Sequence, residues 1–322
     1  MRAAGMPDAA RDSFARLFER LLAGDSGAIH GDELEPVHDL PAFEDLPPPE
    51  PDAGALDRAV VIKLNGGLGT SMGLHGPKSL IEVKPGVTFL DVIVRQVQAL
   101  RRRHGVRLPL VLMNSFSTRE PTQKALERYE DPGVEDFLQS MEPKLLADSL
   151  EPVEWPADPG LEWAPPGHGD IYPSLVGSGM LDALMERGYE YAFVSNSDNL
   201  GAVLEPRILA WLAAERLPFL MEVVEGTDAD RKGGHIARRD GRIVLRETAQ
   251  APEGDDSFGD YRRLRYSNTN NLWISLAALA ERSGALDLPL IVNRKTVDPS
   301  DPDSPAVLQL ETAMGAAVGA LD

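Results

Sequence analysis

AVVIKLNGGLGTSMGLHGPKS, residues 59–79, joins a short apolar run to a glycine-rich segment. Residues 59–64 have the length and the apolar character of a buried strand. Glycine has no Cβ, so it lets backbone N–H groups curl around an anion or approach a nucleobase closely. The stretch therefore predicts a strand that ends in a ligand-binding turn, which is the organising unit of many α/β folds.

The glycine-rich turn matches neither of two common nucleotide-binding templates. A P-loop needs glycine directly before Lys-Ser, whereas Pro77 precedes Lys78 here. A dinucleotide fingerprint needs glycine where Met72 stands. These differences argue against a P-loop ATPase and a standard NAD site, and four glycines within residues 66–73 argue against a simple tight turn. Lys78, which taken alone would be interpreted as a solvent-exposed lysine, can here neutralise charge on phosphate oxygens.

Outward from this stretch, short apolar runs alternate with helical patterns. The runs predict further strands, and the 3.6-residue periodicity predicts helices between them. Strands are expected at 108–113, 191–194 and 219–224, and helices at 88–103, 120–130, 180–187, 204–215 and, at the C-terminus, 308–321. This order predicts an α/β protein with a mostly parallel, mixed central sheet flanked by helices.

Residues 1–57 differ in character from the rest of the chain. Phe14, Leu17 and Leu21 recur at helical spacing, and an acidic, proline-rich stretch follows them. We predict an N-terminal helical and proline-rich segment over 1–57 and a catalytic domain over 58–322. Residues 140–170 are proline-rich and are expected to be irregular.

Composition excludes several classes of protein. The chain has 322 residues, of which 43% are hydrophobic and 26% charged, as in ordinary globular proteins. Its 32 basic and 51 acidic residues give a formal net charge of −19, which argues against general binding of nucleic acid or membrane surfaces. The absence of cysteine excludes disulfides, thiol catalysis and thiolate metal sites, and a cytoplasmic location fits best.

Three polar or glycine-rich segments directly follow predicted strands, at 65–79, 114–119 and 195–201. In open α/β sheets ligands bind at the carboxyl ends of the strands, so we expect these segments to meet at one edge. Asp198, which follows the run YAFV, can hold Mg²⁺ together with substrate phosphates. A helix cap is the alternative interpretation of Asp198, and the two are about equally supported by the residues alone.

Two further motifs carry polar groups suited to ligands. Gly167-His168-Gly169-Asp170 is interpreted as a ligand-contacting loop, with a structural turn as the alternative; no nucleophile motif accompanies it, so triad chemistry is unsupported. The amides of Asn268-Thr269-Asn270-Asn271 can bind sugar hydroxyls, although an isolated run of this kind is often a turn. Lys232-Gly233-Gly234 suits either a close approach to a ligand or a hairpin.

Together these segments resemble the eukaryotic-type UTP–glucose-1-phosphate uridylyltransferases, or UDP-glucose pyrophosphorylases. The similar motifs run from about residue 58 to the C-terminus: KLNGGLGTSMGLHGPKSLIEV, PLVLMNSFST, PPGHGDIYPSL, EYAFVSNSDNLGA, ADRKGGHI, NTNNLWISL, IVNRK and QLETAMGAA. Related nucleotidyltransferases carry arginine at the position of Ser71, and Ser71 followed by Met72 favours the glucose-1-phosphate group. The resemblance implies a Rossmann-like nucleotidyltransferase fold.

The resemblance also implies a reaction and a set of roles. The reaction is reversible, Mg²⁺-dependent, in-line transfer of the uridylyl group from UTP to glucose 1-phosphate, giving UDP-glucose and pyrophosphate without a covalent enzyme intermediate. The implied catalytic residues are Lys78 and Asp198, and Asp198 is also the implied metal ligand. The implied nucleotide-binding residues are Leu64, Asn65, Gly66, Gly67, Met113, Gln139, Gly167, His168 and Asn196. The implied sugar-binding residues are Glu222, Gly234, Asn268 and Asn270.

The family pattern continues past GAAV into a segment similar to RFxPVK, which supplies another phosphate-binding lysine, and then into a left-handed β-helix. This sequence ends at Asp322, before both. Two alternatives therefore stand beside an active enzyme: a non-catalytic or crippled module that binds UTP or UDP-sugars, and a UDP-sugar pyrophosphorylase of broader specificity. Small-molecule substrates are the expected partners, and the oligomeric state is left open by the sequence.

Overall fold

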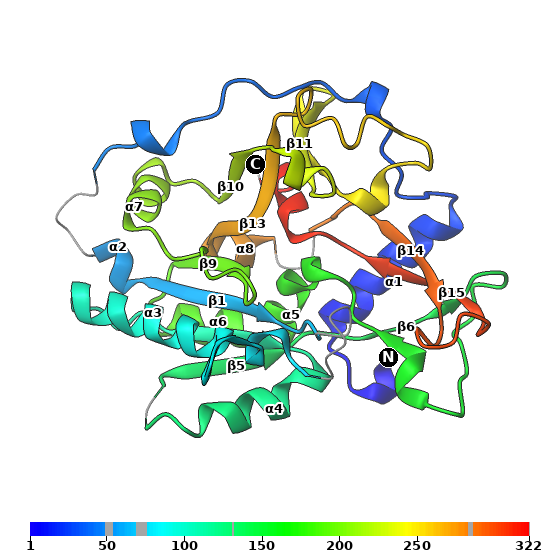
Figure 1. Ribbon diagram of the computed structural model, residues 1–322, viewed down its shortest axis with the longest axis horizontal. Helices are drawn as coiled ribbons and strands as arrows, with labels where there is room; N and C mark the ends of the chain where they lie inside the picture. The colour runs from blue at the N-terminus through cyan, green and yellow to red at the C-terminus, as the bar shows by residue number, and fades with distance from the viewer. Residues whose placement is uncertain (49–53, 69–75, 131, 283–285, 322) are drawn as a thin grey trace.

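The computed structural model describes residues 1–48, 54–68, 76–130, 132–282 and 286–321 (Figure 1). Gly69, Ser71, Met72 and Gly73, which entered the sequence argument, lie outside these ranges. None of the helices in the described ranges combines the length and the apolar character that crossing a bilayer requires.

A mixed sheet of eight strands forms the centre of the described chain, in the order β12-β11-β13-β9-β1-β4-β5, with β10 paired to β13. One half is parallel and consists of β9 (Tyr191–Asn196), β1 (Ala59–Asn65), β4 (Leu110–Asn114) and β5 (Val134–Leu138). The other half is antiparallel and consists of β13 (Tyr266–Ser275), β10 (Phe219–Glu225), β11 (His235–Arg239) and β12 (Arg242–Arg246). The predicted α/β class and mixed sheet are confirmed, although parallel strands make up only this one half.

Helices cover both faces of the sheet, which explains why β1 is buried along its whole length. Val60 and Ile62 pack on one face with α5 (Ile171–Gly177), α6 (Met180–Glu186) and α8 (Leu276–Glu281). Val61 packs on the other face with α2 (Gly54–Asp57), α3 (Phe89–His104) and α7 (Pro206–Glu215). The alternation of side chains along a strand thus divides β1 between two hydrophobic cores.

Most predicted elements are present, and local chemistry sets their ends. The helix α3 begins where Thr88 and Asp91 form a capping box and ends at Gly105, which adopts a left-handed conformation. The helix expected at 120–130 is α4 (Phe116–Leu126), which starts earlier because Ser115 and Thr118 cap it. The strand at 219–224 and the helices at 180–187 and 204–215 correspond to β10, α6 and α7.

The helix predicted over 308–321 is wrong. Residues Ala306–Glu311 form β15, which pairs with β14 (Ile291–Thr296) and with β7 (Leu145–Leu146), and a short 3₁₀ helix follows at Met314–Gly319. Pairing with two neighbouring strands overrides the intrinsic helix propensity of this segment, because tertiary contacts outweigh local propensity. Within the irregular residues 140–170 lie two further short strands, β6 (Glu142–Pro143) and β8 (Trp163–Ala164), while β2 (Glu82–Lys84) and β3 (Val87–Thr88) form a separate hairpin.

The N-terminal residues pack along the outside of the domain that contains the central sheet. The helix α1 (Asp8–Leu22) packs near α5, and the chain then runs across the top of the molecule in Figure 1 before it reaches α2. We call residues 25–46 the N-terminal arm. Ile29 N–H donates to Gln250 O. The backbones of Glu35 and Arg238 form an antiparallel bridge at the edge of β11. The division at residue 57 stays a prediction.

Candidate active site

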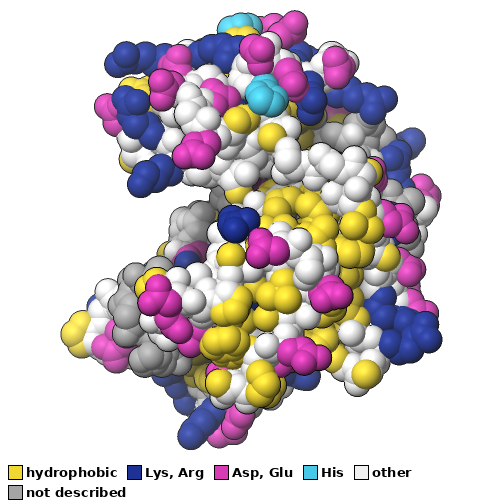
Figure 2. Space-filling model, turned by 90° about the vertical axis from the view of Figure 1, so that its right-hand side faces the viewer, with side chains coloured by type: hydrophobic (Ala, Val, Ile, Leu, Met, Phe, Trp, Pro, Cys, Tyr) yellow, Lys and Arg dark blue, Asp and Glu magenta, His cyan; other side chains and the backbone are white. Residues whose placement is uncertain are grey.

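The carboxyl ends of β1, β4 and β9 bring the three predicted turns to one edge of the sheet. Figure 2 views the molecule from the side to which β1 points in Figure 1, and this face is hollowed between an upper and a lower part. A pocket of about 240 Å³ lies at the edge. Its lining contains the predicted catalytic and nucleotide-binding residues except Asn65, together with two residues not predicted: Leu64, Gly66, Gly67, Lys78, Met113, Gln139, Pro165, Gly167, His168, Asn196, Ser197 and Asp198.

Opposite charges face each other in this pocket. Lys78 Nζ lies 3.0 Å from Asp198 Oδ2, and the two side chains are 35% and 37% exposed. Lys78 N–H donates to Gly67 O, which closes the end of the glycine-rich turn and holds the base of the lysine beside Gly67. The pair therefore sits at the pocket surface, where a phosphate or a metal ion can compete for either partner.

Gly66 and Gln139 pack closely together in one wall of the pocket. A Cβ on residue 66 would lie 2.0 Å from Gln139 Oε1, so any larger side chain there would push the Gln139 amide aside. Gln139 is anchored by its own N–H, which donates to Asn114 O. Leu64 and Met113 add apolar surface to the lining, so this wall offers both apolar contact and an amide group.

Asn65 points away from the pocket. Its Nδ2 donates to Asn114 Oδ1 at 2.7 Å and to Thr122 Oγ1 at 3.0 Å, and the side chain is buried. The side chain is thus engaged inside the fold, and the contact of Asn65 with the nucleotide stays a prediction. A buried amide needs internal partners, so its side chain joins β1 to β4 and α4.

His168 lies in the turn that begins at Gly167, whose φ is 79°. Its Nδ1 accepts a hydrogen bond from Met314 N–H at 3.0 Å, so the proton of the neutral ring is on Nε2. Burial lowers the pKa of His168 to about 4. At neutral pH the ring is therefore an uncharged hydrogen-bond donor in the pocket wall, and it is unsuited to act as a cation.

The same turn is clamped against the segment that follows β15. Gly169 N–H donates to Thr312 O and Thr312 N–H donates to Pro166 O. A Cβ on Gly167 would lie 2.7 Å from Thr312 O, so glycine is needed there for space as well as for its positive φ. Thr312, the last residue of the Gln-Leu-Glu-Thr motif, thus supports the turn that lines the pocket. The motif by itself did not point to this role in the sequence.

Asp170 is a buried acid that the sequence argument did not assign to a role. Its Oδ2 accepts from Ser140 N–H and from Ser174 Oγ, each at 2.6 Å. Burial raises its pKa to about 6 despite these hydrogen bonds. Because Ser140 directly follows Gln139, Asp170 fixes the backbone that carries the Gln139 side chain.

Three of the predicted sugar-binding residues form a second cluster at the same edge. β13 runs antiparallel to β9, so its first residues lie beside the carboxyl end of β9. Asn268 N–H donates to Gly234 O, and Asn268 Nδ2 donates to Asn270 Oδ1 at 3.0 Å. The cluster therefore presents amide groups next to the strand that carries Asn196.

Glu247 belongs to this cluster, although no sequence pattern pointed to it. A Cβ on Gly234 would lie 2.6 Å from its carboxylate, and the carboxylate shares a hydrogen bond with Asn268. Burial raises the pKa of Glu247 in spite of that bond. Its neighbours are joined only by the fold, so spacing along the chain could not have revealed it.

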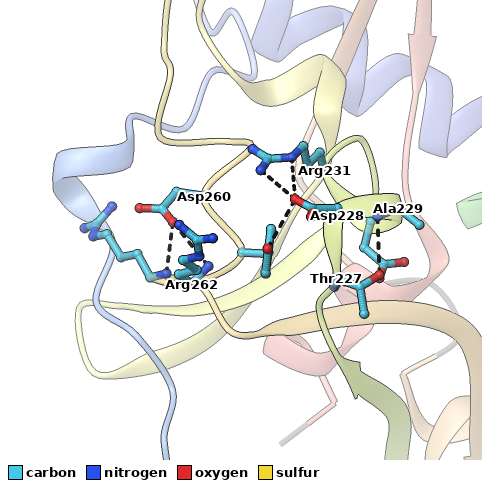
Figure 3. Close-up of polar contacts among 9 residues, drawn as sticks. Thr227, Asp228, Ala229, Arg231, Asp260 and Arg262 are labelled. Atoms are coloured by element: carbon cyan, nitrogen blue, oxygen red, sulfur yellow. Dashed lines mark hydrogen bonds and ion pairs between the residues drawn. The ribbon is translucent and has the colours of Figure 1, made fainter.

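Glu222 lies on β10 beside the asparagine run of β13, with Asn271 as its partner in the register. Its carboxylate accepts from Trp273 Nε1 at 2.7 Å and from Asn271 Nδ2 at 3.2 Å. The carboxylate is thus engaged by β13, and its role in sugar binding stays a prediction. Figure 3 shows the polar contacts of the loop before Gly234, in which Asp228 accepts from both Arg231 and Tyr261.

The predicted magnesium site can be judged from the donors that are present. Among the described residues no group of three histidine, aspartate or glutamate side chains gathers to hold a metal ion. Asp198 nevertheless places one carboxylate at the pocket, and Mg²⁺ commonly uses one or two carboxylates with substrate phosphates and water. The residues therefore fit an ion that arrives with phosphates, and magnesium stays a prediction.

Comparisons with known proteins place the chain among similar sequences and structures. Residues 11–322 match the family model described as UTP–glucose-1-phosphate uridylyltransferase. Relatives of that name from Musa acuminata and Solanum tuberosum are each 42% identical over 97% of this chain, and the chain spans about two thirds of their length, 68% and 67%. A mutant UDP-glucose pyrophosphorylase from Leishmania major, solved in complex with UDP-glucose, is 45% identical with a TM-score of 0.94, covering 99% of this chain and 71% of its own. The predicted nucleotidyltransferase fold is thereby confirmed.

Proposed function

The chain belongs to the UTP–glucose-1-phosphate uridylyltransferase family, and from that premise we propose that it catalyses the reaction for which the family is named. UTP and glucose 1-phosphate would react reversibly to give UDP-glucose and pyrophosphate. The observation that carries the proposal is the pocket in which Lys78 faces Asp198 and which Gly66 and Gln139 also line. A base, a ribose and a phosphate chain can follow one another along that lining.

The chemistry needs positioning and charge neutralisation rather than a covalent intermediate. A phosphate oxygen of the sugar attacks the α-phosphorus of UTP in line, and the bond to the bridging oxygen of pyrophosphate breaks. Lys78 Nζ would neutralise the charge that develops on the phosphate oxygens. His168 Nε2–H would donate a hydrogen bond to the ribose or to a phosphate. Mg²⁺ held by Asp198 would supply further charge neutralisation when it is bound.

Recognition of the two substrates would be divided between the two clusters. The amide of Gln139 offers one donor and one acceptor, which match the imide edge of uracil, while Leu64 and Met113 pack on the ring. The hydroxyls of glucose would meet Gly234, Asn268, Asn270 and the carboxylate of Glu247. Glu222 would act indirectly, through its contacts with Asn271 and Trp273.

An assay of the purified chain tests the proposal. We expect pyrophosphate-dependent consumption of UDP-glucose that stops when EDTA removes the metal ion, and calorimetric binding of UTP in the presence of Mg²⁺. Binding without turnover would support the alternative of a nucleotide-binding module. Comparable rates with galactose 1-phosphate or N-acetylglucosamine 1-phosphate would support broader sugar specificity. Absence of UTP binding would refute both the enzyme and the module. The cytoplasmic location stays a prediction.

A further inference from the structure

Lys63 is a buried lysine directly before the pocket residue Leu64. It lies in β1 on the side of the sheet that carries Val61, and only 2% of it is exposed. Burial of its ammonium lowers the pKa of Lys63 to about 8, partly offset by the carboxylate of Glu222. An apolar residue at this position would avoid the desolvation cost. The burial of a lysine here therefore calls for a role of its ammonium group.

The ammonium joins the two ends of one turn. Lys63 Nζ donates to Ser195 Oγ and to Ala202 O, both at 2.7 Å, and it lies 5.7 Å from the centre of the Phe193 ring. Both acceptor residues are buried. The residues between them, 196–201, contain Asn196, Ser197 and Asp198 of the pocket lining.

Two further hydrogen bonds hold the same turn. Ser197 N–H donates to Leu64 O, and Gln96 Nε2 of α3 donates to Leu200 O at 2.9 Å. Lys63 is the contact that reaches both the strand before the turn and the chain after it. Besides Lys63, the turn is held by the Ser197–Leu64 backbone bond, by the Gln96 amide and by the partly exposed ion pair between Asp198 and Lys78.

We propose that Lys63 is a positioning residue for uridylyl transfer, because it fixes the turn 196–201 and thereby the place of the Asp198 carboxylate opposite Lys78. The proposal rests on the proposed function. A displacement of about 1 Å at a reacting group can lower a rate by about a hundredfold, so a residue without substrate contact can control the rate strongly.

The test compares two buried lysines. Lys63→Met removes the ammonium and keeps an unbranched apolar chain. Lys144→Met is the matched control, because Lys144 is also buried and its Nζ donates to a backbone carbonyl, that of Val297, outside the pocket. Ser195→Ala is a milder variant that removes one acceptor and serves if Lys63→Met does not fold.

Two measurements separate a positioning role from a general loss of stability. Hydrogen exchange of the ligand-free protein should become at least about tenfold faster at 196–203 in Lys63→Met, while 110–114 of the neighbouring strand stays unchanged. With UTP, Mg²⁺ and glucose 1-phosphate, kcat should fall about tenfold to a hundredfold, whereas KM for UTP changes less than about threefold. Lys144→Met should show neither effect.

The proposal is overturned if exchange at 196–203 is unchanged, if it rises equally in 110–114, or if kcat stays within about twofold of the parent. A parent protein that does not bind UTP refutes the proposed function instead. In that case the exchange measurement still decides whether Lys63 holds the turn, so the two failures are distinguishable.

Discussion

Lys78 and Asp198 come from sequence positions 120 residues apart, and their side chains meet at the pocket. Because both are about one third exposed, their ion pair contributes at most about 1 kcal/mol to the free energy of unfolding. Their arrangement therefore matters for the ligand more than for the fold. In the proposed function, Lys78 is the cation that would neutralise the phosphates.

Replacement of Lys78 by alanine should separate these two roles. We expect Lys78→Ala to lower kcat by about a hundredfold to a thousandfold, because a charge-stabilising donor is lost from the transition state. The midpoint of thermal unfolding should stay close to that of the parent. Lys84→Ala, at an exposed position of β2, is the control and should keep full activity. Near-normal rates for Lys78→Ala would remove Lys78 from the mechanism.

His168 should leave a mark on the pH dependence of stability. Its pKa in the folded chain is about 4, below the ordinary value of 6.5, so between these values the unfolded chain binds a proton that the folded chain does not. The contribution of His168 is therefore fully present above about pH 6.5 and is lost as the pH falls toward 4. From pH 7 to pH 5 the free energy of unfolding should fall by about 2 kcal/mol more in the parent than in His168→Asn.

Denaturant unfolding of both proteins at pH 7 and pH 5 measures this difference. The raised pKa of Asp170, about 6, acts in the opposite direction: the folded chain binds a proton between about pH 6 and pH 4 that the unfolded chain does not. The free energy of unfolding should therefore fall more from pH 7 to pH 5 in Asp170→Asn than in the parent. Equal pH dependence in the parent and in His168→Asn would mean that the ring titrates normally. The bond from Met314 N–H to Nδ1 would then be misassigned.

At the scale of elements, the turn around His168 works because two segments far apart in sequence are paired. Gly167 combines a positive φ with a close approach to Thr312 O, while Gly179 has a similar φ of 74° and no atom near its missing Cβ. Their ψ angles differ, however: Gly179 is left-handed with ψ of 3°, whereas Gly167 has ψ of −179°, a region that essentially only glycine occupies. Gly179→Ala should therefore cost about 1–2 kcal/mol for the left-handed conformation, and Gly167→Ala should cost more.

Gly167→Ala should in addition displace the turn that carries His168. We expect its affinity for UTP, measured by calorimetry, to fall by about tenfold or more, whereas Gly179→Ala binds UTP as the parent does. Equal affinities in the two variants would show that the contact with Thr312 does not shape the pocket.

The elements that could be predicted from the sequence are those with strong local signals. The apolar run before the glycines marks β1, and the polar groups after YAFV mark the turn with Asp198. The last strand, β15, was missed because its pairing with β14 is not visible in its own residues. Glu247 and Asp170 were missed for the same reason: their partners, Gly234 and Ser140, are neighbours only in the folded chain.

At the scale of the whole molecule, the N-terminal arm ties distant parts of the sheet together. Arg263 donates from its NH2 group to Gly31 O at 3.0 Å and to Leu34 O at 2.6 Å. Arg207 reaches the far end of the arm and donates to Leu46 O. The arm thus spans the antiparallel half, near Gly234, and reaches α7.

Loss of the Arg263 side chain should loosen this attachment. We expect Arg263→Ala to lower the free energy of unfolding by about 1–3 kcal/mol, because two charge-assisted hydrogen bonds to the arm are removed. Limited proteolysis should then cut within residues 25–46 faster than in the parent. Arg262→Ala, an exposed neighbour, is the control; equal protection in both variants would show that the arm is held by other contacts.

The antiparallel course of β13 beside β9 has a consequence for how the molecule could acquire new acceptors. In the proposed function, the uridylyl donor would be bound by loops that leave strands, and the acceptor largely by residues at the start of a strand that runs the opposite way. The two groups of residues lie at the same edge of the sheet but in different segments of the chain. Substitutions in one group therefore leave the sequence of the other unchanged. Redesign of the preference among hexose phosphates therefore begins at Glu247 and Asn268, leaving the grip on uridine untouched.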